Sequence, residues 1–387
     1  MKSSEMARSA STTRKSFSEV LPPLVLGTAT FNHQYNPDPH SLATTAIIHR
    51  ALSSGIRAFD TSPYYGPAES LLGQALQSQS LVPRSDYILL SKCGRIAADK
   101  FDYSPSWIRQ SIDRSLQRLG TEYLDVVFCH DVEFVEPWEV ISAVQTLREL
   151  RDQGFIRYVG ISGFPTDVLA TLAQQIKDRT GEPLDAVMSY ANYTLQNTLL
   201  FSKALDRLVD AGVDCVLNGS PLGMGLLRSQ GVPVGDMGDF HPAPNALRDR
   251  CVDAANEVQK YGEKGERRLE ILALRFSIEG WIKDGALAGT TVRPLLESAD
   301  DGSPREVSFA RPRVGVSVAG TSYMHELEEL VKIWRDVVGA LEREFLYQKV
   351  LDVFGEEWRD YTWPSPGEGY VRAGQEQQAN TLIKSRM

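Results

Sequence analysis

The stretch Phe59-Asp60-Thr61-Ser62-Pro63-Tyr64-Tyr65-Gly66 decides the fold of this chain of 387 residues. The apolar run 55–59 predicts a buried strand, and 67–73 predicts a helix that begins with a proline. Asp60 would then lie at the carboxyl end of a strand, and Tyr65 in the loop after it. Catalytic side chains of α/β barrels and open α/β sheets lie at this end.

Seven further apolar runs alternate with helical patterns along the chain. They cover 24–30, 87–92, 125–130, 158–162, 186–190, 214–218 and 313–318. Nearly continuous apolar strands of this kind are typical of sheets that are buried on both faces. Eight strands in alternation with helices favour a closed (β/α)8 TIM barrel of class α/β over a doubly wound sheet.

The domain organisation follows from where the apolar pattern begins and ends. We expect a disordered N-terminal tail at 1–20, a single barrel domain at 21–345, and a C-terminal extension at 346–387 that packs on the barrel. The Gly-, Pro- and Ser-rich segment 285–311 predicts an exposed extra loop before the last strand. The tail lacks the apolar region of a secretory signal, and a transit peptide is the alternative to plain disorder.

Composition excludes several classes of protein. The hydrophobic fraction of 42% and the charged fraction of 24% are typical of a globular protein that is not a membrane protein. The net charge of −9 argues against a nucleic-acid partner. No apolar run is long enough to span a bilayer. The four cysteines lack the spacing of metal ligands, so we expect reduced core residues, no metal site and a cytoplasmic protein.

Three successive predicted strands end in an ionisable residue, namely Asp60, Lys92 and His130. Each alone would be an ordinary polar residue, but in a barrel all three would meet Tyr65 at one rim. A phenol has a pKa of about 10, and we expect the ammonium group of Lys92 to lower it. Asp60 would hold Lys92, and His130 would orient the substrate oxygen. Proton transfer to or from a carbonyl oxygen then needs a hydride carrier, which implies a nicotinamide.

These residues resemble the aldo-keto reductase family over about 24–340. The matching motifs are Asp60-Thr61-Ser62-Pro63-Tyr64-Tyr65-Gly66, Leu90-Ser91-Lys92, Phe128-Cys129-His130-Asp131, Gly160-Ile161-Ser162-Gly163-Phe164, Ser220-Pro221-Leu222-Gly223-Met224-Gly225 and Ala319-Gly320-Thr321-Ser322. The resemblance implies that Tyr65 is the general acid and base and that Asp60, Lys92 and His130 support it.

The resemblance also implies which residues contact the cofactor. Ser162 and the polar end of the strand 186–190, with Ser189 and then Asn192, would hold the nicotinamide carboxamide, and Thr28 would lie near a ribose. Ser220, Leu222 and Gly225 would line the pyrophosphate. The adenosine end would lie against the run that contains Gly320, Ser322 and Glu326.

The run 320–326 favours NAD over NADP as the cofactor. It contains Glu326 and no Arg or Lys. A carboxylate repels a 2′-phosphate but accepts a hydrogen bond from a free 2′-hydroxyl group. NADP remains the alternative, because Arg293, Arg305 or Arg311 of the segment 285–311 could fold back toward this position.

Within the family, the sequences 188–193, 219–225 and 363–366 are similar to sugar dehydrogenases that oxidise aldoses of the D-arabinose and L-galactose type at C1. That similarity implies oxidation of a cyclic sugar to its lactone, with Phe31 and His130 on the substrate side. Two alternatives stay open. One is an NADPH-dependent reductase of aldehydes or ketones, and the other is a regulatory subunit that binds the cofactor with little turnover.

Overall fold

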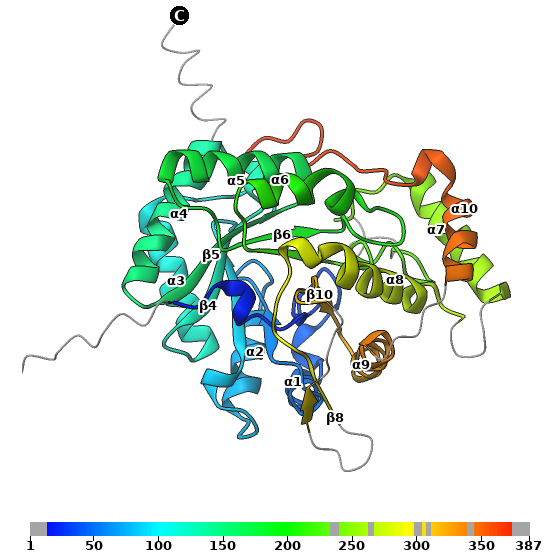
Figure 1. Cartoon of the computed structure of the whole chain (residues 1–387), viewed down its shortest axis with the longest axis horizontal. Coiled ribbons are helices and arrows are strands. Elements are labelled where there is room, and N and C mark those ends of the chain that lie inside the picture. Colours follow the sequence, from blue (N-terminus) through cyan, green and yellow to red (C-terminus); the bar gives the residue numbers. More distant parts are fainter. Residues whose placement is uncertain are drawn as a thin grey trace, which may run out of the picture.

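The computed structural model describes residues 14–232, 240–261, 267–297, 304–306, 311–338 and 344–373. Eight parallel strands close into a barrel in the order β1-β10-β7-β6-β5-β4-β3-β2, which confirms the predicted (β/α)8 architecture (Figure 1). The strands are β1 Leu24–Gly27, β2 Ala58–Asp60, β3 Ile88–Cys93, β4 Leu124–His130, β5 Ile156–Gly163, β6 Ala186–Tyr190, β7 Cys215–Gly219 and β10 Val316–Gly320.

Helices surround the barrel and cover its outer face (Figure 1). They are α1 Thr44–Ser53, α2 Ala68–Gln77, α3 Pro105–Leu119, α4 Pro137–Asp152, α5 Thr166–Thr180, α6 Leu205–Asp210, α7 Asn245–Tyr261, α8 Leu269–Asp284, α9 Met324–Val338 and α10 Glu344–Trp358. In the described residues, none of these helices has the length and apolar character needed to cross a bilayer.

The barrel strands are apolar on both faces because successive side chains enter two different cores. Phe128 points into the barrel interior, while its neighbours Val127 and Cys129 pack against the helices. Gly160 on β5 leaves room for this interior ring, because a Cβ atom there would lie 2.6 Å from the Phe128 side chain. All four cysteines are buried and unpaired, as the sequence predicts.

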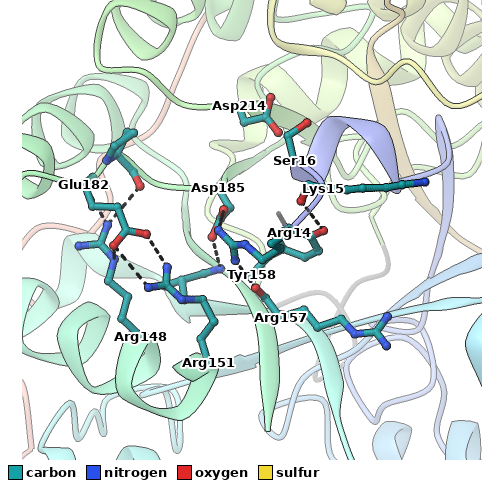
Figure 2. A network of polar contacts seen from close by, with 12 residues as sticks. Arg14, Lys15, Ser16, Arg148, Arg151, Arg157, Tyr158, Glu182, Asp185 and Asp214 are labelled. Atoms are coloured by element: carbon teal, nitrogen blue, oxygen red, sulfur yellow. Dashed lines mark hydrogen bonds and ion pairs between the residues drawn. The ribbon is translucent and has the colours of Figure 1, made fainter. Parts of the chain in front are cut away.

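A short N-terminal segment closes the amino end of the barrel, so the predicted disorder of 1–20 is wrong for its last part. Phe17–Glu19 forms a 3-10 helix, and Phe17 is fully buried with its ring centroid 4.9 Å from that of Tyr158. Ser18 donates from both its backbone and its hydroxyl group to Asp214. Arg14 pairs with Asp185, close to the pair of Arg151 and Glu182 (Figure 2). Residues 1–13 lie outside the described residues.

The segment before the last barrel strand is only partly the exposed loop that the sequence predicts. Thr290 is fully buried and forms a bridge to Val314. Beyond it, β8 Leu295–Glu297 pairs with β9 Pro304–Glu306 in an antiparallel hairpin. The residues on the two sides of this hairpin are therefore joined next to the barrel by the bridge between Thr290 and Val314.

The C-terminal residues extend from one side of the barrel to another. Helix α10 packs on α7 at one edge of the molecule, and the chain after it returns toward α5 and α4 (Figure 1). Trp363 stacks on Phe164, which directly follows β5, with ring centroids 4.8 Å apart. Arg372 forms an ion pair with Glu139 at the start of α4. The segment thus crosses the carboxyl end of β5.

Candidate active site

Three neighbouring strands bring the predicted ionisable residues to one rim. Asp60 ends β2, Lys92 is the last but one residue of β3, and His130 ends β4. The three strands pair in parallel, so their carboxyl ends lie side by side. Tyr65 follows in the loop between β2 and α2, and its ring centroid lies 5.6 Å from that of His130. All four predicted catalytic residues therefore come together.

Lys92 and Asp60 form a buried ion pair in which every N–H of the ammonium group has an acceptor. Nζ of Lys92 lies 2.7 Å from each carboxylate oxygen of Asp60 and 3.0 Å from the carbonyl oxygen of Thr61. Burial raises the pKa of the Asp60 carboxyl, and the charge of Lys92 opposes that rise. The ammonium contacts the ring face of Tyr65, 4.7 Å from the centroid.

The expected lowering of the Tyr65 pKa by Lys92 is wrong for the protein alone. Burial raises the pKa of Tyr65 well above its ordinary value, the charges of Asp60 and Asp131 add to the rise, and Arg95 opposes it. The reason is that Asp60 neutralises Lys92 at short range. Among the described residues, the Tyr65 hydroxyl group has no hydrogen-bond partner, which leaves it available to a substrate.

His130 is a neutral, oriented imidazole. Burial lowers its pKa to about 3. Its Nδ1 lies 3.1 Å from Oγ of Ser62, and this hydroxyl oxygen also accepts a hydrogen bond from the backbone N–H of Tyr64. The imidazole plane stands at 88° to the Tyr65 ring. The loop that carries Tyr65 therefore also fixes the histidine.

Two charged residues of the site, Arg95 and Asp131, have no role in the sequence prediction. They form an ion pair whose side chains are 15% and 3% exposed. The guanidinium carbon of Arg95 lies 4.0 Å from the ring centroid of Tyr64. Both residues come shortly after predicted strand ends, and Asp131 also stands in the motif 128–131; these are the sequence signals that could have identified them.

The residues expected at the nicotinamide lie on the neighbouring strands. Ser162 on β5 and Ser189 on β6 are buried, and Ser189 pairs in register with Gly163. Nδ2 of Asn192 donates to the Ser189 hydroxyl group at 3.0 Å. Thr28 is also buried, and its backbone N–H and hydroxyl group both donate to the carbonyl oxygen of Asp60. These groups thus share one rim with the four catalytic candidates.

The loop after β7 is a series of tight turns. Ser220, Gly223, Met224 and Gly225 all have positive φ angles, between 51° and 96°. The backbone N–H groups of Gly223 and Gly225 donate to the carbonyl oxygens of Ser220 and Leu222 within the loop. The pyrophosphate role of Ser220, Leu222 and Gly225 stays a prediction.

The start of α9 holds the residues expected at the adenosine end. Oε2 of Glu326 accepts the backbone N–H groups of Ser322, at 2.6 Å, and of Tyr323, at 3.2 Å. Glu326 therefore also caps its own helix, which the sequence prediction did not include. Gly320 is exposed at the end of β10, and the buried hydroxyl group of Thr321 has no partner among the described residues.

Two arginines of the segment 285–311 lie far from this position. Arg293 lines a cavity at the amino end of the barrel together with Glu19 and Arg57. Arg311 donates to the carbonyl oxygen of Lys283, next to the end of α8. The side chain of Arg305 lies outside the described residues.

The predicted substrate contact at Phe31 is wrong. Phe31 is fully buried in the core that packs the helices on the barrel. Its neighbour Asn32 is also buried and caps the following turn through the backbone N–H of Gln34. The loop folds inward here because a phenyl ring gains more from burial than from exposure at the mouth. His130 is thus the one predicted substrate contact that lies at the rim.

Comparison with known proteins agrees with this geometry. The aldo/keto reductase family model matches residues 23–341. D-arabinose 1-dehydrogenase of Saccharomyces cerevisiae is 42% identical over 266 residues, which are 68% of this chain and 77% of that protein. L-galactose dehydrogenase of Arabidopsis thaliana is 37% identical over 236 residues, or 60% and 69% of the two chains. D-threo-aldose 1-dehydrogenase of a Pseudomonas species is 26% identical over 282 residues, or 66% and 82%. The chain therefore belongs to the aldo/keto reductase family and is an oxidoreductase.

Proposed function

We propose that this enzyme is an NAD-dependent dehydrogenase that oxidises an aldose of the D-arabinose or L-galactose type at C1 to its lactone. One observation carries the proposal: Tyr65 lies between the buried Asp60–Lys92 pair and a neutral His130. Two relatives above 35% identity are named as sugar dehydrogenases, which supports the substrate class.

The chain's residues manage the proton and the oxygen of the reaction. Tyr65 removes the proton of the C1 hydroxyl group as the C1–O bond becomes a carbonyl. His130 donates from Nε2 to that oxygen and orients it. Lys92, paired with Asp60, contacts the Tyr65 ring 4.7 Å from its centroid and holds the ring in place. Arg95 is the charge that lowers the pKa of Tyr65 and so favours the phenolate that accepts the proton. Ser162 and Ser189 would hold a nicotinamide, which would supply the acceptor for the hydride that leaves C1.

Glu326 supports NAD rather than NADP as the cofactor. Its carboxylate occupies the backbone N–H groups of Ser322 and Tyr323, which would otherwise be free to bind a phosphate at this helix start. The same carboxylate would repel a 2′-phosphate. Arg293 and Arg311 are held elsewhere by backbone carbonyl groups.

The reaction is tested by NADH absorbance after the protein is mixed with NAD and a panel of aldoses. We expect NADH from D-arabinose or L-galactose, and a fall in kcat of about 100-fold to 10,000-fold in Tyr65→Phe, because the general base is lost. Val371→Ala, on an exposed side chain, is the control. No NADH from any aldose, together with NADPH oxidation by simple aldehydes, would replace the proposal with the reductase alternative.

Cofactor preference is tested by dissociation constants for NAD and NADP from protein fluorescence. We expect tighter binding of NAD, and in Glu326→Ser a shift of the ratio toward NADP by about tenfold or more, since the variant frees two donors and removes a charge. Glu329→Ser on the same helix is the control. Tighter binding of NADP by the unmodified protein would contradict the prediction.

A further inference from the structure

Arg95 and Asp131 lie against the catalytic residues but outside the proposed proton transfer. Asp131 follows His130 directly and has a left-handed backbone, with φ of 56°. Its Oδ2 accepts from Arg95 and lies 3.6 Å from Nε2 of His130. Gly94 precedes Arg95 with a φ of 95°, and its lack of a Cβ atom leaves room for the Tyr103 ring, which a Cβ atom would approach to 2.3 Å. The pair is thus held by backbone conformation on both sides.

The surroundings of His130 favour one tautomer. The Ser62 hydroxyl oxygen accepts from the backbone N–H of Tyr64 and can still donate its own proton, and Nδ1 of His130 lies 3.1 Å from it. This contact suits either direction of the hydrogen bond. The opposite nitrogen, Nε2, lies 3.6 Å from the carboxylate of Asp131, which favours a proton on Nε2 and disfavours a lone pair. Asp131 therefore favours a neutral ring with Nε2–H, in which Nδ1 accepts from Ser62.

The two members of the Arg95–Asp131 ion pair have opposite effects on the pKa of His130 and of Tyr65, so these effects oppose each other only when both residues are present. Asp131 favours the imidazolium form, while Lys92 and Arg95 oppose it. The same pair acts on Tyr65 in opposite senses, because Asp131 raises and Arg95 lowers the pKa of the phenol. Asp60 is paired with Lys92, and the phenol rings of Tyr64 and Tyr65 are the other titratable groups that face the imidazole.

We propose that Arg95 and Asp131 are positioning residues that act as one fixed ion pair: together with Ser62 they hold His130 as a neutral Nε2–H donor, and they set the protonation of Tyr65. This inference rests on the proposed function, because it assigns His130 and Tyr65 the roles given there. Neither residue of the pair transfers a proton itself.

The tautomer is tested on the protein without substrate, so that the outcome does not depend on turnover. Two-bond ¹⁵N–¹H spectra of histidine-labelled protein, with His130 assigned from the missing signals of His130→Gln, report which nitrogen carries the proton. We expect an Nε2–H pattern at every pH between 5 and 9, and mixed tautomers in Ser62→Ala. An Nδ1–H pattern or a charged ring at neutral pH in the unmodified protein would overturn the proposal.

The electrostatic role is tested by two variants that break the same ion pair. In Arg95→Met we expect the rise of kcat/KM with pH to move up by about one pH unit or more, and in Asp131→Asn to move down. A purely structural role would move both profiles in the same direction or leave them unchanged, and that result would overturn the proposal. The double variant leaves no unpaired charge and should have an intermediate profile.

Two controls keep this test decisive. Arg95→Lys retains the charge and should restore most of the unmodified pH profile. Arg157→Met removes an arginine that pairs with Asp125 at the amino end of the barrel, where N–O is 3.0 Å, and should leave the profile unchanged. If Arg157→Met moves the profile as Arg95→Met does, the effect is not local and the proposal fails. Absence of aldose turnover would reject the proposed function alone, and the tautomer spectra would still decide the positioning role.

Discussion

Two buried histidines show how single residues link this fold to pH. His130 at the active site and His241 in the loop before α7 are 5% and 3% exposed. Nε2 of His241 lies 2.8 Å from the carbonyl oxygen of Gly223, and its Nδ1 accepts the backbone N–H of Ala243. Burial lowers the pKa of His130 to about 3 and that of His241 to about 4. Both rings are neutral in the folded protein.

These shifts predict a loss of stability in mild acid. A histidine whose pKa is lower in the folded protein contributes stability that is complete above its unfolded pKa of about 6.5 and is lost as pH falls toward the folded value. At pH 5 the contribution of each histidine to the free energy of unfolding should be about 2 kcal/mol smaller than above a pH of about 6.5. Urea unfolding of His241→Gln at pH 7 and pH 5 should show a pH effect smaller by that amount. His40 is exposed, so an equally reduced pH effect in His40→Gln would contradict the attribution of the acid sensitivity to buried histidines.

At the scale of elements, the 3-10 helix Phe17–Glu19 acts as a plug of the barrel. Phe17 and Leu21 share one apolar cluster with interior residues of the strands, such as Val126. Thr290 donates to the carbonyl oxygen of Ser18, so the plug is also tied to the last barrel segment. It lies at the amino end, opposite to Tyr65 and its partners.

Removal of this plug contact should therefore cost stability but not catalysis. We expect Phe17→Ala to lower the free energy of unfolding by about 3 to 5 kcal/mol, because a fully buried phenyl ring is lost. Its kcat/KM should stay within about twofold under conditions where the protein is folded. Chemical denaturation measures the first quantity and NADH production the second. Phe155→Ala, whose side chain is 39% exposed, is the control and should cost less.

Across the whole molecule, the C-terminal segment joins three regions that are distant in sequence. Gln196 donates to the carbonyl oxygens of Trp358 and Tyr361 in the region after β6. Ser365 donates to Glu133 in the loop after β4, and burial raises the pKa of that carboxyl to about 8. Trp363 lies between these two anchor points on Phe164.

Trp363 should therefore be the residue that keeps this segment on the barrel. In Trp363→Ala we expect cleavage by a nonspecific protease within 359–373 to accelerate by about tenfold or more. The reason is that opening of this segment no longer breaks the stacking of an indole ring on Phe164. Fragments identified by mass spectrometry locate the cuts. Val371→Ala, with 53% exposure, should not change the rate. Uniform acceleration across the barrel would indicate global destabilisation instead.

The sequence alone determined the barrel and the identity of its catalytic rim. Eight apolar runs alternate with helices, and Asp60, Lys92 and His130 each stand where an apolar run stops. Parallel strands place such ends together whatever their loops do. Glu326 could likewise be located from the motif after the last strand.

The tertiary structure decided which partner each of these groups has. Lys92 donates its N–H groups to Asp60 and Thr61. Its effect on the pKa of Tyr65 could therefore not be derived from the order of the strands. Phe31 lies in a polar loop but turns into the core. The pair of Arg95 and Asp131 joins two loops, separated by 36 residues in sequence. Electrostatic interactions depend on distance and burial, which no local pattern of residues contains.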